Sequence, residues 1–486
     1  PTRRSSDLLD GNDMTATTGS GSIEFNNTIT GPGNLLVRTT GTGYFGGAVS
    51  GLTTLTTNTD GLIHINAGTI TTVGDQEYND YLIFDSNTTM ATTGGGDISF
   101  NRDINADTGA QSLTLNTSGV NYFNALVGNN TPLASLTTDA PGSTTINTTA
   151  ISTNGNQTFN DAVNLTSDSA LSAGTGNITF NSVLNGAYNL ELNTTGINAF
   201  NAIVGGVSPL ASIMTDAGGS TTINTSAITT SGGQTYNDAV NLSVDTTLSS
   251  AADGTGLGDI TFNAALNGAR NLVLNTAGNN VFNAIVGGTT PLTTITTNAP
   301  GSTIINTTAI TTSDDQTYND AVLLTSDTAL SSGALGDGLG DITFNNTLDG
   351  EQQLALNTAG NTIFNAIVGD IDPLASITTN SGGVTIINTT AITTEGDQTY
   401  NDPVLLTSDT AISTDSAGDI TFNNTLNGEQ HLALNTAGST IFNAIVGGVD
   451  PLASITTDAA GNTIINTTAI TTEGDQTYND PVLLTS

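Results

Sequence analysis

Gly418-Asp-Ile-Thr-Phe-Asn423 and Gly474-Asp-Gln-Thr-Tyr-Asn-Asp480 are two forms of one short segment that recurs along this chain. Each form begins with Gly-Asp, places Thr directly before an aromatic residue, and continues with Asn. Alternation with a period of two is typical of a strand with one buried side, and Thr, Ile and aromatic residues favour the pleated surface. Gly, Asn and Asp at the borders indicate turns. The segment therefore predicts a short β-strand between two turns.

Four such strand ends, here called anchors, form a longer repeat. In the last full copy they are Phe422, Phe442, Ile465 and Tyr478. The set occurs six times, and the last anchors of successive copies lie 81, 77, 82, 82 and 78 residues apart. Self-similarity of this kind marks a repeat architecture. The equivalent anchors of the other copies are Phe344, Phe364, Ile387, Tyr400; Phe262, Phe282, Ile305, Tyr318; Phe180, Phe200, Ile223, Tyr236; Phe100, Phe123, Ile146, Phe159; and Phe25, Phe45, Ile65, Tyr78.

Asn follows the anchor in 23 of these 24 cases, and Gly46 is the exception. Asn and Gly are the residues that most easily adopt a left-handed backbone conformation, so one interpretation is a left-handed corner after each buried anchor. The other interpretation is an amide ladder, which forms when Asn side chains of adjacent, aligned strands stack on each other.

The anchor spacing predicts an all-β solenoid built from the six repeats of about 80 residues. Phe422 and Phe442 are 20 residues apart and Phe442 and Ile465 are 23 apart, which suits rungs of that length, and we expect three or four rungs per repeat. Only 13 residues separate Ile465 from Tyr478, so these anchors share a larger rung or bound an unusually tight one. The alternative fold is a string of β-sandwiches. The chain has no Trp to pin such modules and no recognisable linkers, which favours the solenoid.

The recurring segments resemble the β-strand repeats of giant bacterial exoproteins, a group that includes filamentous-haemagglutinin-like adhesins and autotransporter passengers. The resemblance extends over residues 15–486 and includes Pro451-Leu-Ala-Ser-Ile-Thr-Thr-Asp-Ala-Ala-Gly461 as well as the two segments quoted above. It implies a right-handed parallel β-helix, export to the cell surface, and a role in adhesion or surface structure. The secretion domain of two-partner-secreted members and a translocating barrel are not recognisable.

Composition limits the classes of partner. The 486 residues carry a net charge of −38, with five Arg and no Lys, Cys or Trp. Nucleic acids and anionic membranes bind through Lys and Arg, so neither is expected as a partner. The absence of Cys excludes disulfides and thiol nucleophiles. No apolar run is long enough for a transmembrane helix, so we expect no membrane insertion of this segment.

The chain divides into two segments by origin. Residues 1–8 read as the translation of a common sequencing adapter, so we expect them to be foreign to the protein. Residues 9–486 are expected to be one continuous solenoid region and a fragment truncated at both ends, because the sequence stops within a repeat.

Candidate catalytic residues are few. His64 and His431 are the only histidines, and neither recurs in the other repeats. With no Lys or Cys, the available nucleophiles and bases are hydroxyls and carboxylates. A glycosidase needs a pair of carboxylates flanking a cleft, whereas acids spread evenly along repeats are more simply explained by solvation. We therefore expect no enzymatic activity and no catalytic residues, and keep a polysaccharide-processing β-helix as an alternative.

Calcium is the one cofactor that the sequence suggests. Each repeat places an Asp two residues after its last anchor, and four of them place another nine residues after it, as in Asp402 and Asp409 or Asp320 and Asp327; the first repeat has Asn87 there. Calcium needs six to eight oxygen ligands at one site. Equivalent Asp residues of neighbouring repeats would lie about 14–19 Å apart at ~4.8 Å per rung. A site would therefore form within one repeat, and these four residues are its candidate ligands.

The sequence predicts a non-enzymatic structural and adhesive stalk segment of a large exported bacterial surface protein, located outside the cell. Partners would be a host-surface, glycan or neighbouring-cell ligand, and divalent cations could join acidic copies to one another. Two short windows, 370–371 and 380–384, hold all differences between the near-identical segments 363–408 and 441–486, and are candidate ligand contacts together with the insertions at 251–258 and 332–340. The alternative with the same role is a calcium-rigidified chain of β-sandwiches.

Overall fold

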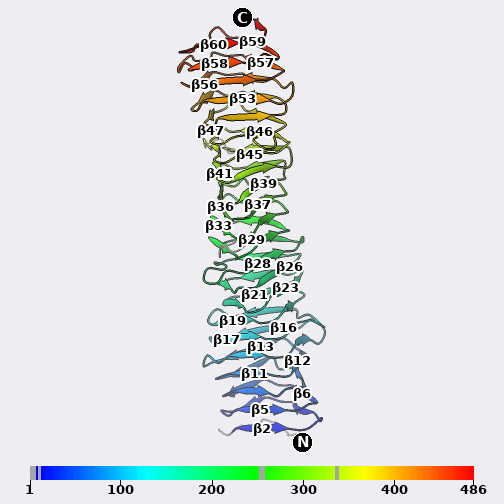
Figure 1. Ribbon diagram of the computed structural model, residues 1–486. Coiled ribbons are helices and arrows are strands. Elements are labelled where there is room, and N and C mark those ends of the chain that lie inside the picture. Colours follow the sequence, from blue (N-terminus) through cyan, green and yellow to red (C-terminus); the bar gives the residue numbers. More distant parts are fainter. Residues whose placement is uncertain (1–6, 9–12, 251–257, 334–338, 486) are drawn as a thin grey trace. The chain divides into compact units, whose positions relative to one another are not determined.

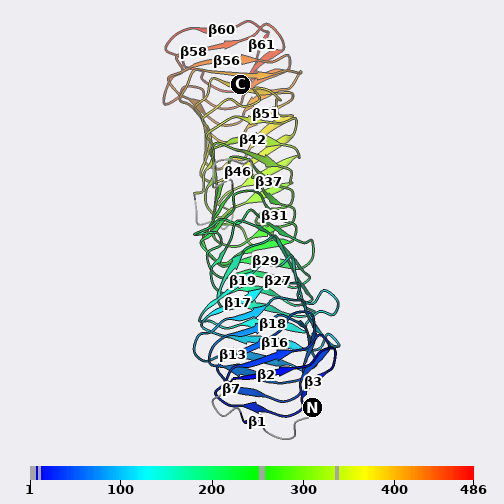
Figure 2. The same ribbon diagram turned by 60° about the horizontal axis from the view of Figure 1, so that its bottom comes forward.

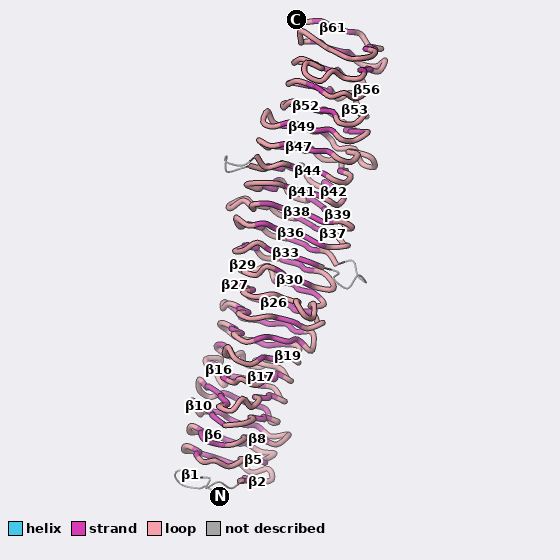
Figure 3. Tube along the Cα trace, turned by 90° about the vertical axis from the view of Figure 1, so that its left-hand side faces the viewer, coloured by secondary structure: helices cyan, strands magenta, loops and turns pink. Residues whose placement is uncertain are grey.

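The computed structural model describes residues 7–8, 13–250, 258–333 and 339–485. These residues form strands, turns and loops and contain no helix, as Figure 3 shows. Among them there is accordingly no helix that could cross a membrane. The chain forms two units, residues 1–238 and 239–486, and each is described by itself.

Each unit is a coil in which every turn supplies strands to three parallel sheets (Figure 1 and Figure 2). In the first unit, for example, the strands of one turn pair in parallel with the equivalent strands of the next turn. The strands of a complete repeat and its neighbours there are β10 (Thr69–Thr72), β11 (Gln76–Tyr78), β12 (Tyr81–Phe84), β13 (Thr88–Thr92), β14 (Ile98–Phe100), β15 (Ile104–Ala106), β16 (Ser112–Asn116), β17 (Val120–Phe123), β18 (Ser135–Thr138), β19 (Ser143–Ile146) and β20 (Ala150–Ser152).

The second unit has the same construction, and the strand pairings among its described residues are parallel, as between β51 and β54. Its last repeats contain β40 (Ala309–Thr311), β41 (Gln316–Tyr318), β42 (Ala321–Leu324), β43 (Thr328–Ser331), β44 (Ile342–Phe344), β45 (Leu348–Asp349), β46 (Gln353–Asn357), β47 (Asn361–Phe364), β48 (Ser376–Thr379), β49 (Val384–Ile387), β50 (Ala391–Thr394), β51 (Gln398–Tyr400), β52 (Val404–Leu406), β53 (Thr410–Thr414), β54 (Ile420–Phe422), β55 (Leu426–Asn427), β56 (His431–Asn435), β57 (Ser439–Phe442), β58 (Ser454–Thr457), β59 (Asn462–Ile465), β60 (Gln476–Tyr478) and β61 (Val482–Leu484).

The predicted parallel β-solenoid is thus confirmed, and the alternative of separate β-sandwich modules is wrong. A sandwich packs two antiparallel sheets within each module. Here the strands of successive turns form continuous parallel ladders instead, such as β47–β49–β52–β55. The right-handed sense of the coil stays a prediction.

One sequence repeat does not equal a whole number of turns. From β11 to β20 the chain makes ten strands, and an isolated bridge at Val127 adds an eleventh strand position before the next repeat begins at β21 (Gln157–Phe159). Eleven positions shared among three sheets amount to three and two-thirds turns. Equivalent strands of successive repeats therefore change sheet, and β11, β21 and β31 (Gln234–Tyr236) belong to three different sheets. The same holds for β41, β51 and β60 in the second unit.

This register also explains the short spacing between the last two anchors. Ile387 ends β49 and Tyr400 ends β51, with β50 between them. The two anchors therefore lie on different sheets, two strand positions apart within one turn, which is the first of the two explanations that the sequence left open.

The anchors form aromatic stacks in the interior. The ring centroids of Tyr400 and Phe422 are 5.2 Å apart with planes 10° from parallel, and those of Phe422 and Phe442 are 5.6 Å apart at 5°. All three side chains are buried. Because parallel pairing places Tyr400 opposite Phe422 and Phe422 opposite Phe442, the sequence repeat becomes a column of rings along the coil.

The Asn residues after the anchors form a ladder on the outer side of the same strands. The amide Nδ2 of Asn423 donates to Oδ1 of Asn401 at 2.8 Å, that of Asn443 to Asn423 at 2.6 Å, and that of Asn466 to Asn443 at 2.7 Å. The amide-ladder interpretation is confirmed. The left-handed corner is wrong, because Asp60 is the one non-glycine residue in the described part of the chain that has a positive φ.

Candidate functional site

Two of the calcium candidates, Asp320 and Asp402, lie inside the coil. Asp402 is 1% exposed, and its carboxylate accepts the hydroxyl of Thr379 at 2.5 Å and that of Thr385 at 2.8 and 2.9 Å. Alternation from the anchor explains this position: Tyr400 points inward, Asn401 outward and Asp402 inward again.

Asp320 has the same environment one repeat earlier. It accepts Thr297 at 2.5 Å and Thr303 at 2.9 and 3.0 Å, and in addition Nδ2 of Asn280 at 3.1 Å. Burial raises the pKa of both carboxyl groups above the ordinary value of 3.8, and the hydroxyl donors oppose the shift. Hydroxyl hydrogens thus occupy these oxygens, so the two groups act as internal acceptors that hold neighbouring strands together.

The other two candidates, Asp327 and Asp409, are exposed and bind backbone. Oδ1 of Asp409 accepts the amide N–H of His431 at 2.9 Å, and Oδ1 of Asp327 accepts that of Gln353 at 2.9 Å. Each carboxylate therefore fixes the start of the next strand in its sheet. The structure separates the inner from the outer candidates, and within the described residues no three His, Cys, Asp or Glu side chains gather as a metal-ligand group.

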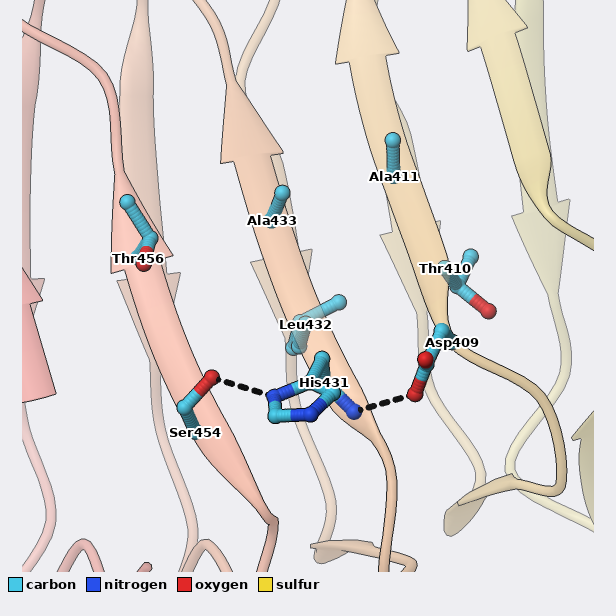
Figure 4. A pocket seen from close by; sticks show the side chains of 8 residues that line it. All are labelled: Asp409, Thr410, Ala411, His431, Leu432, Ala433, Ser454 and Thr456. Carbon is cyan, nitrogen blue, oxygen red and sulfur yellow. Dashed lines mark hydrogen bonds between the residues drawn. The ribbon is translucent and has the colours of Figure 1, made fainter. Parts of the chain in front are cut away.

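The two histidines occupy different surroundings. Nδ1 of His64 lies 2.9 Å from Oδ1 of Asp85, and Nδ1 of His431 lies 2.8 Å from Oγ of Ser454. A nucleophile–base–acid relay would need Asp409 to orient the His431 ring. Asp409 instead binds the His431 backbone, as Figure 4 shows, so the Asp, His and Ser of this region do not form a relay.

A shallow groove surrounds His431 on the outer surface of β53, β56 and β58. We call it the Ala433 groove; its volume is about 290 Å³. Figure 4 shows its polar rim at Asp409, His431 and Ser454, and its floor at the methyl groups of Ala411 and Ala433. The full lining comprises Asp409, Thr410, Ala411, His431, Leu432, Ala433, Ser454 and Thr456.

The preceding repeat has an equivalent groove on β43, β46 and β48. We call it the Ala355 groove; its volume is about 250 Å³, and Gln353 takes the place of His431. Its lining comprises Asp327, Thr328, Ala329, Gln353, Leu354, Ala355, Ser376 and Thr378. The two grooves thus share an acidic rim, one Ser, two Thr and a floor of two Ala residues.

The rim recurs in earlier repeats, whereas the floor changes. In the first unit, Asp168 accepts the N–H of Asn189 at 2.9 Å, and Ser212 donates to the Asn189 side chain at 2.7 Å, which reproduces the rim. Glu191 and Met214 then stand at the positions of Ala433 and Thr456, as the pairing of β26 (Asn189–Thr194) with β28 (Ser212–Thr215) shows. Larger side chains therefore occupy the space that Ala leaves open.

The sequence reasoning did not find the grooves. Its candidate contacts were the variable windows and the insertions. Ile371, in the first window, is 78% exposed at a loop after the bridge residue Val368, and residues 380–383 form the turn between β48 and β49. The insertions lie mostly outside the described residues. The signal for the grooves is a pair of outward-facing Ala residues in adjacent strands, visible only once the 22-residue register between Ala411 and Ala433 is known.

Comparison with known proteins gives no relative: no protein-family model matches the chain, and no curated protein and no solved structure matches it.

Proposed function

We propose that this chain is a non-enzymatic segment of a large exported bacterial surface protein, in which the solenoid serves as stalk and as adhesive surface. The observation that carries the proposal is the turn-by-turn repetition of one architecture in each unit, with rings stacked in the interior and Asn amides paired on the outer side. Such a unit extends by adding turns, without enlarging a globular core.

Two surface features support the adhesive part. Successive repeats expose the same polar rim on different sheets, so contacts are available on several sides of each unit. The side chain of Val449 is 81% exposed at the position equivalent to Ile371, so the variable window places apolar side chains in solvent. These side chains lie in one of the two windows that differ between two otherwise identical segments, and they are accessible to a partner.

Bead adhesion tests the proposal. Beads coated with the chain should be retained on surfaces of epithelial cells, bacterial cells or immobilised polysaccharide above the level of beads coated with an unrelated protein of similar net charge. Retention at the control level on every surface would overturn the adhesive role. Repeating the assay with calcium and with chelator tests the proposed cation bridges, because only bridged contacts lose strength in chelator.

A further inference from the structure

We infer that the Ala433 and Ala355 grooves bind uncharged sugar residues, and that their positions on different sheets make the chain a cross-linker of neutral glycan chains. The inference rests on the proposed adhesive function and names the ligand class of these two sites.

The chemistry of the lining matches a sugar ring. A sugar offers hydroxyl groups that both donate and accept, and a face of C–H groups. The Ala433 groove offers a carboxylate acceptor at Asp409, hydroxyls at Ser454 and Thr456, and a floor of methyl groups. One oxygen of Asp409 binds the His431 amide, and this exposed carboxylate has a second oxygen that can accept a sugar hydroxyl.

Charge selects neutral glycans over acidic ones. Each groove has an Asp on its rim and no Arg in its lining, and the whole chain carries a net charge of −38. An anionic sugar would meet like charge at the rim and in the surrounding field, which lowers both its rate of encounter and its affinity.

Size and depth indicate weak individual sites. Volumes of about 290 and 250 Å³ lie at or below the lower end of small-molecule pockets. One or two sugar residues fill such a space, and a shallow site leaves much of the ligand in water. Useful binding therefore depends on several contacts to one polymer network.

The repeat register determines how a polymer can reach the grooves. β53, β56 and β58 belong to one sheet of the second unit, and β43, β46 and β48 to another. Three and two-thirds turns separate equivalent positions, or about 18 Å along the coil at ~4.8 Å per turn. A glycan chain lying straight along one sheet reaches one groove only, so two chains bind on two sides of the unit and become joined.

Calorimetric titration of the full chain tests this inference. The probes are cellopentaose, laminaripentaose and mannopentaose as neutral ligands and pentagalacturonate as the acidic one. The variants Ala433→Leu and Ala355→Leu each fill one floor, and Ala199→Leu is the matched control, an outward Ala of β27 (Ile197–Phe200) outside both grooves. Circular dichroism checks that each variant keeps the fold.

At least one neutral pentasaccharide should bind with a millimolar dissociation constant at two sites per chain, and the acidic one at least tenfold more weakly. Each single variant should lose one site, the double variant should lose at least tenfold in affinity, and Ala199→Leu should bind as the parent does. The matching long polysaccharide should produce turbidity with the parent chain and not with either single variant.

Three results would overturn the inference: no binding of any neutral probe, equal binding of the acidic probe, or binding that the double variant retains. The bead assay separates this outcome from failure of the proposed function. If beads that carry the double variant still adhere, the adhesive function is supported but the grooves are not its cause. If the chain binds a neutral probe but the coated beads do not adhere, the sugar-binding sites are supported and the adhesive function is overturned.

Discussion

The buried carboxylates of two adjacent repeats differ by one donor. Asp320 accepts hydrogen bonds from two Thr hydroxyls and from the amide of Asn280. Asp402 keeps the two Thr donors, and Thr362 occupies the position of the Asn. The Thr362 hydroxyl is buried and has no hydrogen-bond partner in the described part of the chain. The pair shows that the two hydroxyl donors are common to both sites, whereas the third donor varies.

The comparison also shows that neither solution is complete. Oδ1 of Asn280 is itself buried and unpaired among the described residues, so the Asn supplies one bond and leaves one oxygen without a partner. A buried polar atom without a partner costs about 1–3 kcal/mol. The interior of the coil therefore contains polar groups whose hydrogen bonds are only partly satisfied.

Removal of the hydroxyl that contacts both carboxylate oxygens should have the largest effect. Thr385→Val leaves Asp402 with Thr379 alone and should cost about 3 kcal/mol, because the lost bond is made to a charged, buried group. Thr303→Val leaves Asp320 with two donors and should cost about 2 kcal/mol. Hydrogen exchange of the amides around each site measures the local free energy of opening.

The control for this pair is Thr378→Val, an exposed neighbour of Thr379, which should change stability by about 0.5 kcal/mol or less. Equal losses from Thr385→Val and Thr303→Val would show that the Asn280 amide adds nothing to its site.

A second buried hydrogen bond is present in both repeats, and its loss should lower the stability of both by the same amount. The hydroxyl of Tyr400 donates to Oε1 of Gln398 at 2.9 Å, and that of Tyr318 donates to Gln316 at 3.0 Å. Tyr400→Phe and Tyr318→Phe should each cost about 1–2 kcal/mol, because a buried acceptor loses its donor. In an earlier repeat Phe159 already lacks the hydroxyl, and Oε1 of Gln157 has no partner in the described residues.

The reverse change provides the check. Phe159→Tyr should stabilise its repeat by about 1 kcal/mol in chemical denaturation followed by amide exchange. Destabilisation by this variant would mean that the ring column has no room for the hydroxyl, and the cost of Tyr400→Phe would then need another cause.

The sequence alone predicts much of this architecture, inside and outside the coil. Period-two alternation and the spacing of the Phe and Tyr anchors lead to the stacked rings and the Asn ladder, because parallel pairing repeats whatever the sequence repeats. The same alternation also places Asp402 inward, two residues after Tyr400. Reading the acid as a surface ligand overlooked this, since composition suggests that isolated Asp residues are solvated.

The number of strand positions per repeat, and so the sheet to which each strand belongs, could not be predicted from the sequence for a physical reason. In the five repeats after the first, the eleventh strand position is a single bridging residue, such as Val368, which is followed by a loop that runs Gly-Asp-Ile-Asp-Pro. No strand pattern surrounds it, so a count of strands from sequence gives ten. That one residue makes the repeat three and two-thirds turns long instead of three and one-third, so it determines to which sheet each equivalent strand moves and therefore which sheet carries each groove.

The stability of both sites should depend on pH in the direction opposite to that of a salt-bridged Asp. Burial raises the pKa of Asp402 and Asp320 above 3.8, so the folded state binds the proton more tightly than the unfolded chain. This stabilisation is fully present below the unfolded pKa and is lost as pH rises through the raised folded pKa. Unfolding temperatures measured from pH 4 to pH 8 should fall with rising pH.

The chain contains 43 Asp and Glu residues, so the variant Asp402→Asn is needed to isolate the contribution of the buried group. The variant keeps an acceptor oxygen for the Thr hydroxyls and loses the buried charge. Its stability relative to the parent should increase as pH rises. A constant difference across the range would show that Asp402 does not change its protonation state on folding.

Exchanging the one residue that distinguishes the two sites should have the smallest effect. Thr362→Asn gives Asp402 a third donor and should stabilise its repeat by about 1 kcal/mol, and Asn280→Thr should destabilise the Asp320 site by about the same amount. Each variant turns one site into the other, so the double variant should leave the sum of the two local stabilities nearly unchanged, as expected for sites in different repeats. Hydrogen exchange of the backbone amides around Asp320 and Asp402 measures the local free energy of opening at both sites in one protein. If Thr362→Asn is destabilising, the backbone around Thr362 has adapted to the smaller side chain, and the difference between the sites lies in packing and not in the number of hydrogen bonds.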